Sequence, residues 1–138
     1  MRTKKDILEE IIGLGYPKNE IALKLDDFFD NEHCTEESIG VNVYPDQPAI
    51  ANFFKTFKNL IASKKAGAVF VRICDIEEPE DWFFSDTVYV IGDLTLEELK
   101  DSVAHLFPDE IYDYWMYGKP INVPETKENE KIYSLWWD

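Results

Sequence analysis

The sequence comprises 138 residues, of which 45% are hydrophobic and 14% aromatic, and its 28 acidic and 14 basic residues give a net charge of −14. This length predicts a single domain, 1–138, because one domain typically takes about 100–200 residues, and the apolar content excludes an intrinsically disordered chain. The negative field disfavours direct binding to nucleic acid or to anionic membranes. No run approaches the ~18 apolar residues of a membrane span, and acids follow MRTKK before any apolar run, unlike in a secretory signal. We therefore expect a cytoplasmic protein with reduced cysteines.

The negative charge is concentrated in the second half of the chain. Residues 70–138 contain 17 acidic and 5 basic residues, whereas residues 1–69 contain 11 and 9. Between Asp75 and Asp113 there are 13 acids and a single base. The stretch 47–71, by contrast, contains four lysines and no acid. The sequence therefore predicts a polarised surface whose acidic part would attract a basic partner.

The first half of the chain predicts one capped helix and two strands. Thr3 and Asp6 have the spacing of a capping box, and the apolar stripe that follows predicts a helix that ends near Gly13. Residues 20–25 and 38–44 each alternate apolar and polar side chains, which predicts a strand in each segment.

The middle of the chain predicts a long helix followed by two buried strands. Pro48 is well placed in the first turn of this helix. Its apolar side chains recur with helical spacing: Ile50, Phe53, Phe54, Phe57, Leu60 and Ile61. Residues 67–76 are apolar on both faces, which indicates an interior strand, and residues 87–91 form a second strand rich in β-branched side chains.

The last third of the chain predicts two helices and a final strand. Thr95 and Glu98 form a second capping box. A shorter helix is expected from Pro108, and a strand over 131–137. Because strands and helices do not alternate regularly, we predict the α+β class: a single domain with a mostly antiparallel sheet packed by helices.

No motif in the sequence predicts catalysis, a cofactor or a metal site. The P-loop, GxSxG, HExxH and GxGxxG patterns do not occur. His33 and His105 lie too far apart to show a metal-ligand spacing. His33 precedes Cys34, but neighbours in sequence rarely form a nucleophile–base pair. We therefore expect a protein that is not an enzyme and has no cofactor.

An acidic run that leads into aromatic residues is the strongest candidate for a site. It contains Asp75, Glu77, Glu78, Glu80 and Asp81, followed by Trp82, Phe83 and Phe84 and then Asp86. No glycine between residues 67 and 92 supplies the sharp turn of a calcium loop. Two interpretations stay open: a solvated turn whose aromatics enter the core, or a protein-binding site with acids that steer and an aromatic anchor.

Two tryptophans stand close to the end of the sequence. In a strand, Trp136 and Trp137 point to opposite faces, so we expect one of them to enter the core. The other is expected to be covered by a helix or to be exposed in an interface.

Four segments of the sequence resemble one bacterial family. They are LDDFFDNEHCTEESIGVNV (25–43), DWFFSDTVYVI (81–91), FPDEIYDYW (107–115) and LWWD (135–138). Together they resemble the immunity protein 22 family, the predicted immunity proteins of polymorphic toxin systems. The resemblance covers residues 20–138, and residues 1–19 form a helical extension outside it. Phe83 departs from the family pattern, which commonly has proline after the tryptophan that Trp82 matches.

The resemblance implies an α+β intracellular protein that binds and neutralises a cognate protein toxin and has no catalysis of its own. An acidic face can occupy the basic substrate cleft of a nuclease toxin as phosphates would. The candidate toxin-binding residues are Asp75, Glu77, Glu78, Glu80, Asp81, Trp82 and Asp86, and the secondary candidates are Asp109, Glu110 and Trp137. The sequence does not specify an oligomeric state.

Two alternative functions stay open from the sequence. The first is a small acidic hydrolase that uses carboxylates such as Asp86, Asp109 and Glu110. The second is a non-catalytic regulatory subunit that dimerises through its tryptophan-rich end.

Overall fold

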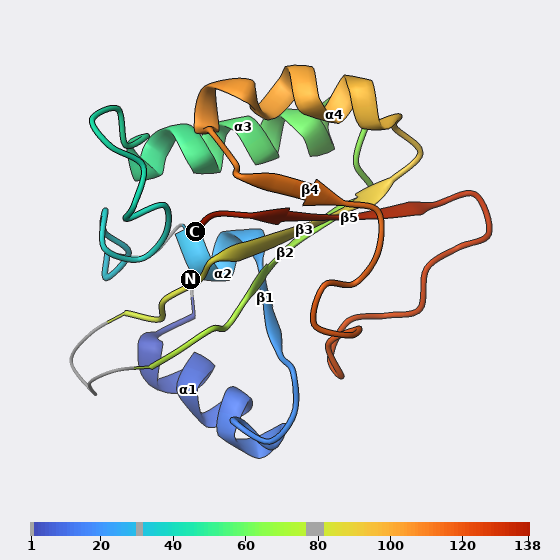
Figure 1. Cartoon of the computed structure of the whole chain (residues 1–138). Helices are drawn as coiled ribbons and strands as arrows, with labels where there is room; N and C mark the ends of the chain where they lie inside the picture. Colours follow the sequence, from blue (N-terminus) through green and yellow to red (C-terminus); the bar gives the residue numbers. More distant parts are fainter. Residues whose placement is uncertain (1, 30–31, 77–81) are drawn as a thin grey trace.

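Strand β3 lies at the centre of a five-stranded sheet in the computed structural model, which describes residues 2–29, 32–76 and 82–138. The strand order is β1-β2-β3-β5-β4, and every neighbouring pair is antiparallel. All six residues of β3 are buried, because helices cover one face of the sheet and a long connection crosses the other (Figure 1). The strands are β1 (Ala22–Lys24), β2 (Ala68–Arg72), β3 (Thr87–Gly92), β4 (Glu110–Tyr112) and β5 (Lys131–Trp136). The α+β class predicted from the sequence is therefore confirmed.

The helices pack on this sheet through apolar stripes. Helices α3 and α4 lie side by side on one face (Figure 1). Helix α1 lies near β1 and α2, away from the α3–α4 layer. The helices are α1 (Lys4–Gly13), α2 (Leu25–Phe29), α3 (Ile50–Ala62) and α4 (Leu96–Val103), and a 3-10 turn η1 (Ala104–Leu106) follows α4. Both predicted capping boxes are present, at Thr3 and at Thr95.

Helix α1 shares the main hydrophobic core. Ile7 and Ile11 have no exposed surface and belong to the same cluster as Phe53 and Val88. Residues 1–19, predicted to be an extension, therefore contribute through this helix to the core of the domain. No helix within the described residues has the length and apolar character needed to cross a membrane.

Two sequence predictions of secondary structure are wrong. Residues 38–44, expected as a strand, form turns. Gly40 takes a positive φ of 69°, and a Cβ built there would lie 3.1 Å from the Phe53 ring, so the chain bends and lets that ring pass. A helix was expected from Pro108, but strand β4 lies there. Phe107 takes a positive φ of 54°, so the chain turns directly from η1 into β4.

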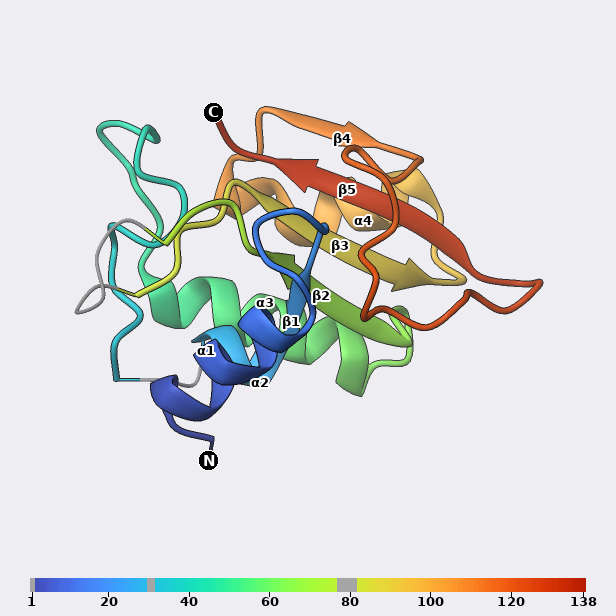
Figure 2. The same ribbon diagram turned by 90° about the horizontal axis from the view of Figure 1, so that it is seen from below.

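A connection between β4 and β5 covers the sheet face opposite α3 and α4. We call residues 113–123 the strap; they cross this face in front of β3 and β5 (Figure 2). Beneath the strap lies a second, smaller core with Tyr89, Ile91 and Val123 at its centre and Trp115 packed against it. The side-chain amide of Asn122 fastens the strap by donating to, and accepting from, the backbone of Ala22 (2.6 and 3.1 Å).

Candidate functional site

The described residues of the acidic run 75–86 do not form one exposed surface. Glu77, Glu78, Glu80 and Asp81 lie outside the described residues. Asp75 is exposed, and its carboxylate accepts a hydrogen bond from the backbone N–H of Ile76 (2.8 Å).

Trp82, the predicted aromatic anchor of this run, is a core residue. It is 7% exposed, and its indole N–H donates to the backbone oxygen of Phe28 (3.0 Å). Its ring contacts Phe83 and stacks against His33. A side chain held in this way supports the fold and offers little surface to a partner.

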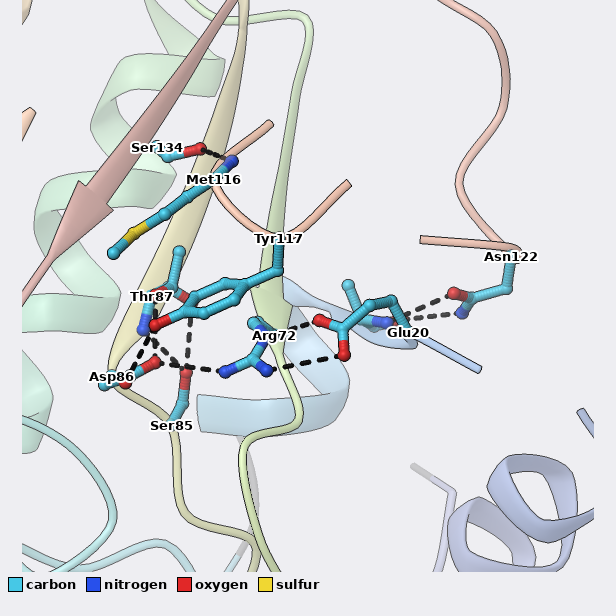
Figure 3. A network of polar contacts seen from close by, with 10 residues as sticks. Glu20, Arg72, Ser85, Asp86, Thr87, Met116, Tyr117, Asn122 and Ser134 are labelled. Atoms are coloured by element: carbon cyan, nitrogen blue, oxygen red, sulfur yellow. Dashed lines mark hydrogen bonds and ion pairs between the residues drawn. The ribbon is translucent and has the colours of Figure 1, made fainter. Parts of the chain in front are cut away.

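Asp86, the last predicted residue of the run, belongs to a charge cluster around Arg72. The Arg72 guanidinium pairs with Glu20 through Nε (2.5 Å) and with Asp86 through Nη1 (3.4 Å). Thr87 donates its hydroxyl to the same Asp86 oxygen (2.9 Å), and the ring of Tyr117 on the strap stacks over the guanidinium at 3.6 Å (Figure 3). Burial opposes the charge of Arg72, but the hydrogen bond and charge of Glu20, together with Asp86, raise its pKa. The cluster therefore joins the segment before β1, strand β2, the start of β3 and the strap.

A buried phenol lies beside this cluster. Tyr89 has no exposed surface, and burial raises the pKa of its hydroxyl. Within the described part of the chain that hydroxyl has no hydrogen-bond partner. Its ring packs edge-on against Trp115 of the strap, with centroids 4.9 Å apart.

Cys34 is not an activated nucleophile. Burial raises the pKa of its thiol to about 12, in spite of a hydrogen bond with Ser38 that lowers it. The ring of the neighbouring His33 stacks on the Trp82 indole. A thiol with this pKa is protonated at neutral pH and is a poor nucleophile. Cys34 and Cys74 are both free in the structure.

The raised pKa of the Cys34 thiol predicts that the protein loses stability at alkaline pH. The folded state holds the Cys34 proton more tightly than the unfolded chain does. The contribution of this thiol to the unfolding free energy is therefore complete below about pH 9 and is lost as pH rises toward 12. Between these values the unfolding free energy should fall by up to about 1.4 kcal/mol per pH unit. Urea titrations at several pH values should show a shallower alkaline slope for Cys34→Ala than for the unsubstituted protein. Equal slopes would contradict the assignment.

A different set of acidic and aromatic side chains does share one surface. We call it the acidic-aromatic face: Tyr44, Asp46, Phe107, Asp109, Glu110 and Asp138. Its residues come from the loop before α3, the turn after η1 with the first residue of β4, and the segment after β5, which meet at one end of the sheet (Figure 1). Asn42 helps to join these segments, because its side-chain amide donates to the backbone oxygen of Asp138 (2.9 Å).

Two shallow clefts meet on the acidic-aromatic face. The first, of about 340 Å³, lies between Tyr44 and Asp46 on one side and Phe107 and Asp109 on the other. The second, of about 450 Å³, continues from Phe107 and Asp109 past Glu110. Phe107 and Asp109 line both clefts, so the phenyl ring and the carboxylate stand between them. The only base in either lining is Lys100.

The two aromatic residues of this face are unusually open to solvent. Tyr44 is 92% exposed and Phe107 is 50% exposed. Phe107 also takes the left-handed conformation, which costs a residue other than glycine about 1–2 kcal/mol. Strained residues that present a side chain to solvent are concentrated at binding and catalytic sites. The backbone strain and the exposed ring together single out Phe107.

The secondary candidates from the sequence divide between surface and core. Asp109 and Glu110 are exposed and belong to the acidic-aromatic face. Asp109 also accepts a hydrogen bond from the backbone N–H of Asp138 (2.6 Å). Trp137 is only 1% exposed, so it is the core tryptophan of the pair and is not available as an interface anchor. Trp136 is partly exposed on the opposite side of β5.

The structure places the three carboxylates of the hydrolase interpretation in two different surroundings. Asp86 is held by Arg72 and Thr87, whereas Asp109 and Glu110 border the clefts beside Phe107. Within the described ranges, no hydrogen bond joins Asp86 to either of the other two. Those ranges also contain no group of three or more potential metal ligands.

Tyr44 and Phe107 were not identified as site residues from the sequence. Tyr44 stands beside the turn-forming PDQP segment, which was a signal for a surface position. Phe107 ends an apolar helical stripe and is followed by proline, a pattern that equally predicts a core residue. Its exposure depends on the left-handed turn, which the sequence does not indicate.

Comparisons with known proteins give one family and no relative of known structure. Neither a search of curated proteins nor a search of solved structures found a significant match. A family model described as Uncharacterized protein YfbO family matches residues 2–135, which include helix α1 and every residue of the acidic-aromatic face except Asp138. Because the match spans nearly the whole chain, this protein belongs to the YfbO family.

Proposed function

We propose that this protein is a cytoplasmic immunity-type protein that binds and neutralises a basic protein toxin through the acidic-aromatic face. The observation that carries the proposal is the exposure of Tyr44 and Phe107 among four carboxylates. Exposed tyrosine, surrounded by polar groups that exclude water on binding, is typical of the residues that dominate binding energy. The resemblance to immunity protein 22 supports the same class of function.

Charge complementarity determines the kind of partner. Asp46, Asp109, Glu110 and Asp138 surround the clefts, and Lys100 is the one base beside them. Such a surface attracts a basic partner and repels nucleic acid. A nuclease toxin fits this description, because its substrate cleft must be basic to bind phosphates. Glu77, Glu78, Glu80 and Asp81 add to the net negative charge that attracts a basic partner.

The experiment is co-expression with the product of the adjacent gene, followed by measurement of protection and of the affinity of the complex. We expect Tyr44→Ala to weaken the complex by about 30-fold or more, since a central aromatic anchor contributes about 2 kcal/mol or more. The unfolding free energy of the Tyr44→Ala variant alone should change by less than about 0.5 kcal/mol, because Tyr44 is almost fully exposed. Tyr114→Ala is the matched control: it removes a tyrosine of the strap that is 54% exposed and lines neither cleft.

Phe107→Gly separates loss of binding from loss of folding. Glycine adopts the left-handed conformation of residue 107 at no steric cost, so this variant should remain folded while it loses the phenyl ring. The affinity should also fall as salt is raised, because the partner is attracted by charge. Binding unaffected by Tyr44→Ala and Phe107→Gly would refute the assignment of this face, and failure to bind or protect would refute the proposed function.

A further inference from the structure

A polar groove between α3 and α4 has no part in the proposed toxin-binding face. The two helices lie side by side on the sheet (Figure 1), and a groove of about 470 Å³ opens between them. We call it the α3–α4 groove; its lining comprises Asn52, Lys55, Thr56, Asn59, Leu60, Ser63, Lys65, Ser102 and His105. Eight of these nine side chains are polar, which is unusual between two helices that share a hydrophobic core.

The periodicity of α3 explains why the groove is polar. Phe53, Phe57 and Leu60 turn one side of the helix into the core and are almost fully buried. The neighbouring stripe carries Asn52, Lys55, Asn59 and Ser63 at helical spacing and faces α4. From the α4 side, the Nε2 atom of His105 lies 2.7 Å from the hydroxyl of Thr56, a hydrogen bond that fixes the imidazole in the groove wall.

The groove differs in charge from the rest of the molecule. Its lining contains two lysines and a histidine but no carboxylate, although the chain has a net charge of −14. Lys55 has no ion-pair or hydrogen-bond partner within the described residues. Lys65 lies near Glu98 and helps to lower the pKa of that carboxyl, after the larger effect of the Thr95 hydrogen bonds, but it forms no ion pair with it in the same ranges. Lys58, in contrast, lies outside the groove and pairs with Asp26 (3.0 Å).

We propose that the α3–α4 groove binds a small phosphorylated molecule of mononucleotide size. Lysine ammonium groups are strong ligands for phosphate oxygens. The side-chain amides of Asn52 and Asn59, which have no hydrogen-bond partner in the part of the chain that the structure describes, can donate to and accept from a polar sugar or base. The volume falls within the range of about 300–1,000 Å³ that is usual for small-molecule sites.

Electrostatic screening favours a small anion over a polymer. At physiological ionic strength, charges more than about 8 Å apart are largely screened. A ligand confined to the groove therefore experiences mainly Lys55 and Lys65, with Glu98 near Lys65 opposing them, and little of the charge elsewhere on the molecule. A nucleic acid strand would extend beyond the groove onto the acidic remainder of the surface and be repelled. The site therefore discriminates by ligand size as well as by charge.

The test is a backbone-assigned NMR titration of the full chain with adenosine monophosphate, ribose 5-phosphate, inorganic phosphate and adenosine. We expect adenosine monophosphate to shift the amide signals of residues 52–65 and 102–105 with a dissociation constant of about 1 mM or lower. Adenosine, which lacks the phosphate, should produce no such shifts. Comparison of ribose 5-phosphate with inorganic phosphate distinguishes a sugar phosphate from the free ion as the bound species.

Variants of the lysines make the titration decisive. The double substitution Lys55→Gln and Lys65→Gln should weaken binding at least about tenfold, because it removes both charge-assisted contacts. Lys58→Gln, on the same helix but outside the groove, should leave the affinity unchanged. Absence of shifts with every phosphate, or equal affinity in the double variant, would overturn the proposal. Tighter binding of a single-stranded oligonucleotide than of adenosine monophosphate would overturn the assignment of a small ligand.

Discussion

Substitution of Trp137 by alanine should lower the unfolding free energy by about 4 kcal/mol, the usual cost of removing a large aromatic side chain from a core. Trp137 is 1% exposed, its ring packs edge-on against Phe53 of α3 at 5.4 Å, and its indole N–H donates to the backbone oxygen of Leu106 (2.8 Å). The residue thus joins the end of β5 to the helical layer. Urea denaturation followed by circular dichroism measures the loss.

Two companion variants identify the source of that loss. Trp137→Phe retains an aromatic ring but leaves the Leu106 oxygen without its donor, so it should cost about 1–3 kcal/mol, less than the alanine variant. Trp136→Ala, on the partly exposed side of the same strand, should cost less than either core deletion. A Trp137→Ala protein as stable as Trp136→Ala would show that Trp137 is not a core residue.

Substitution of Arg72 by methionine should cost about 3 kcal/mol, because two partly buried carboxylates would lose their shared cation. Arg72 contacts Glu20 on the segment before β1, Asp86 before β3 and Tyr117 on the strap. Its side chain is 12% exposed, so water replaces little of the lost interaction. The measurement is again urea denaturation, with hydrogen exchange of the strap amides as a local readout.

The matched control neutralises the whole cluster. In the triple variant Arg72→Met, Glu20→Gln, Asp86→Asn no charge remains unpaired, so stability should recover by at least half relative to Arg72→Met. Arg72→Lys retains the charge but loses the planar contact with Tyr117 and the forked hydrogen bonds. Its stability should lie between that of Arg72→Met and that of the unsubstituted protein. A triple variant that is less stable than Arg72→Met would mean that the hydrogen bonds, and not the uncompensated charges, hold the cluster together.

The sequence was sufficient to predict the elements whose signals are local. The capping boxes at Thr3 and Thr95, the apolar stripe of α3 and the buried run of β3 all appear where expected. In each case the side chains that form the contact lie within one or two helical turns or one strand, so spacing alone reveals them.

The failed predictions share a physical cause, which is a left-handed residue that redirects the chain. Ile39 and Val43 have the alternation of a strand, but Gly40 bends the segment so that the Phe53 ring fits against it. Tyr114 and Trp115 have helical spacing with Ile111, but the turn at Phe107 leads Ile111 into a strand that pairs with β5. Both turns are determined by packing across the fold, which local patterns do not contain.

The candidate site was only partly predictable for the same reason. Asp109 and Glu110 could be found because acidic residues are seldom buried without a partner. Trp82 and Trp137 were offered as anchors because tryptophan is common in interfaces, but it is as common in cores, and only the contacts with Phe28 and Leu106 decide between the two. Clefts that bring residues 44, 107 and 138 together depend on the tertiary fold.

The position of β5 within the sheet has a consequence for synthesis of the protein on the ribosome. β5 is made after the other four strands of this sheet, yet it lies between β3 and β4. At about 5–20 residues per second, the interval between the end of β3 and the start of β5 lasts roughly 2–8 s. Throughout that interval the burial of β3 cannot be completed, and the edge of β3 that pairs with β5 has no partner strand. A nascent chain stalled before residue 131 therefore presents the type of edge that chaperones bind and from which aggregates grow.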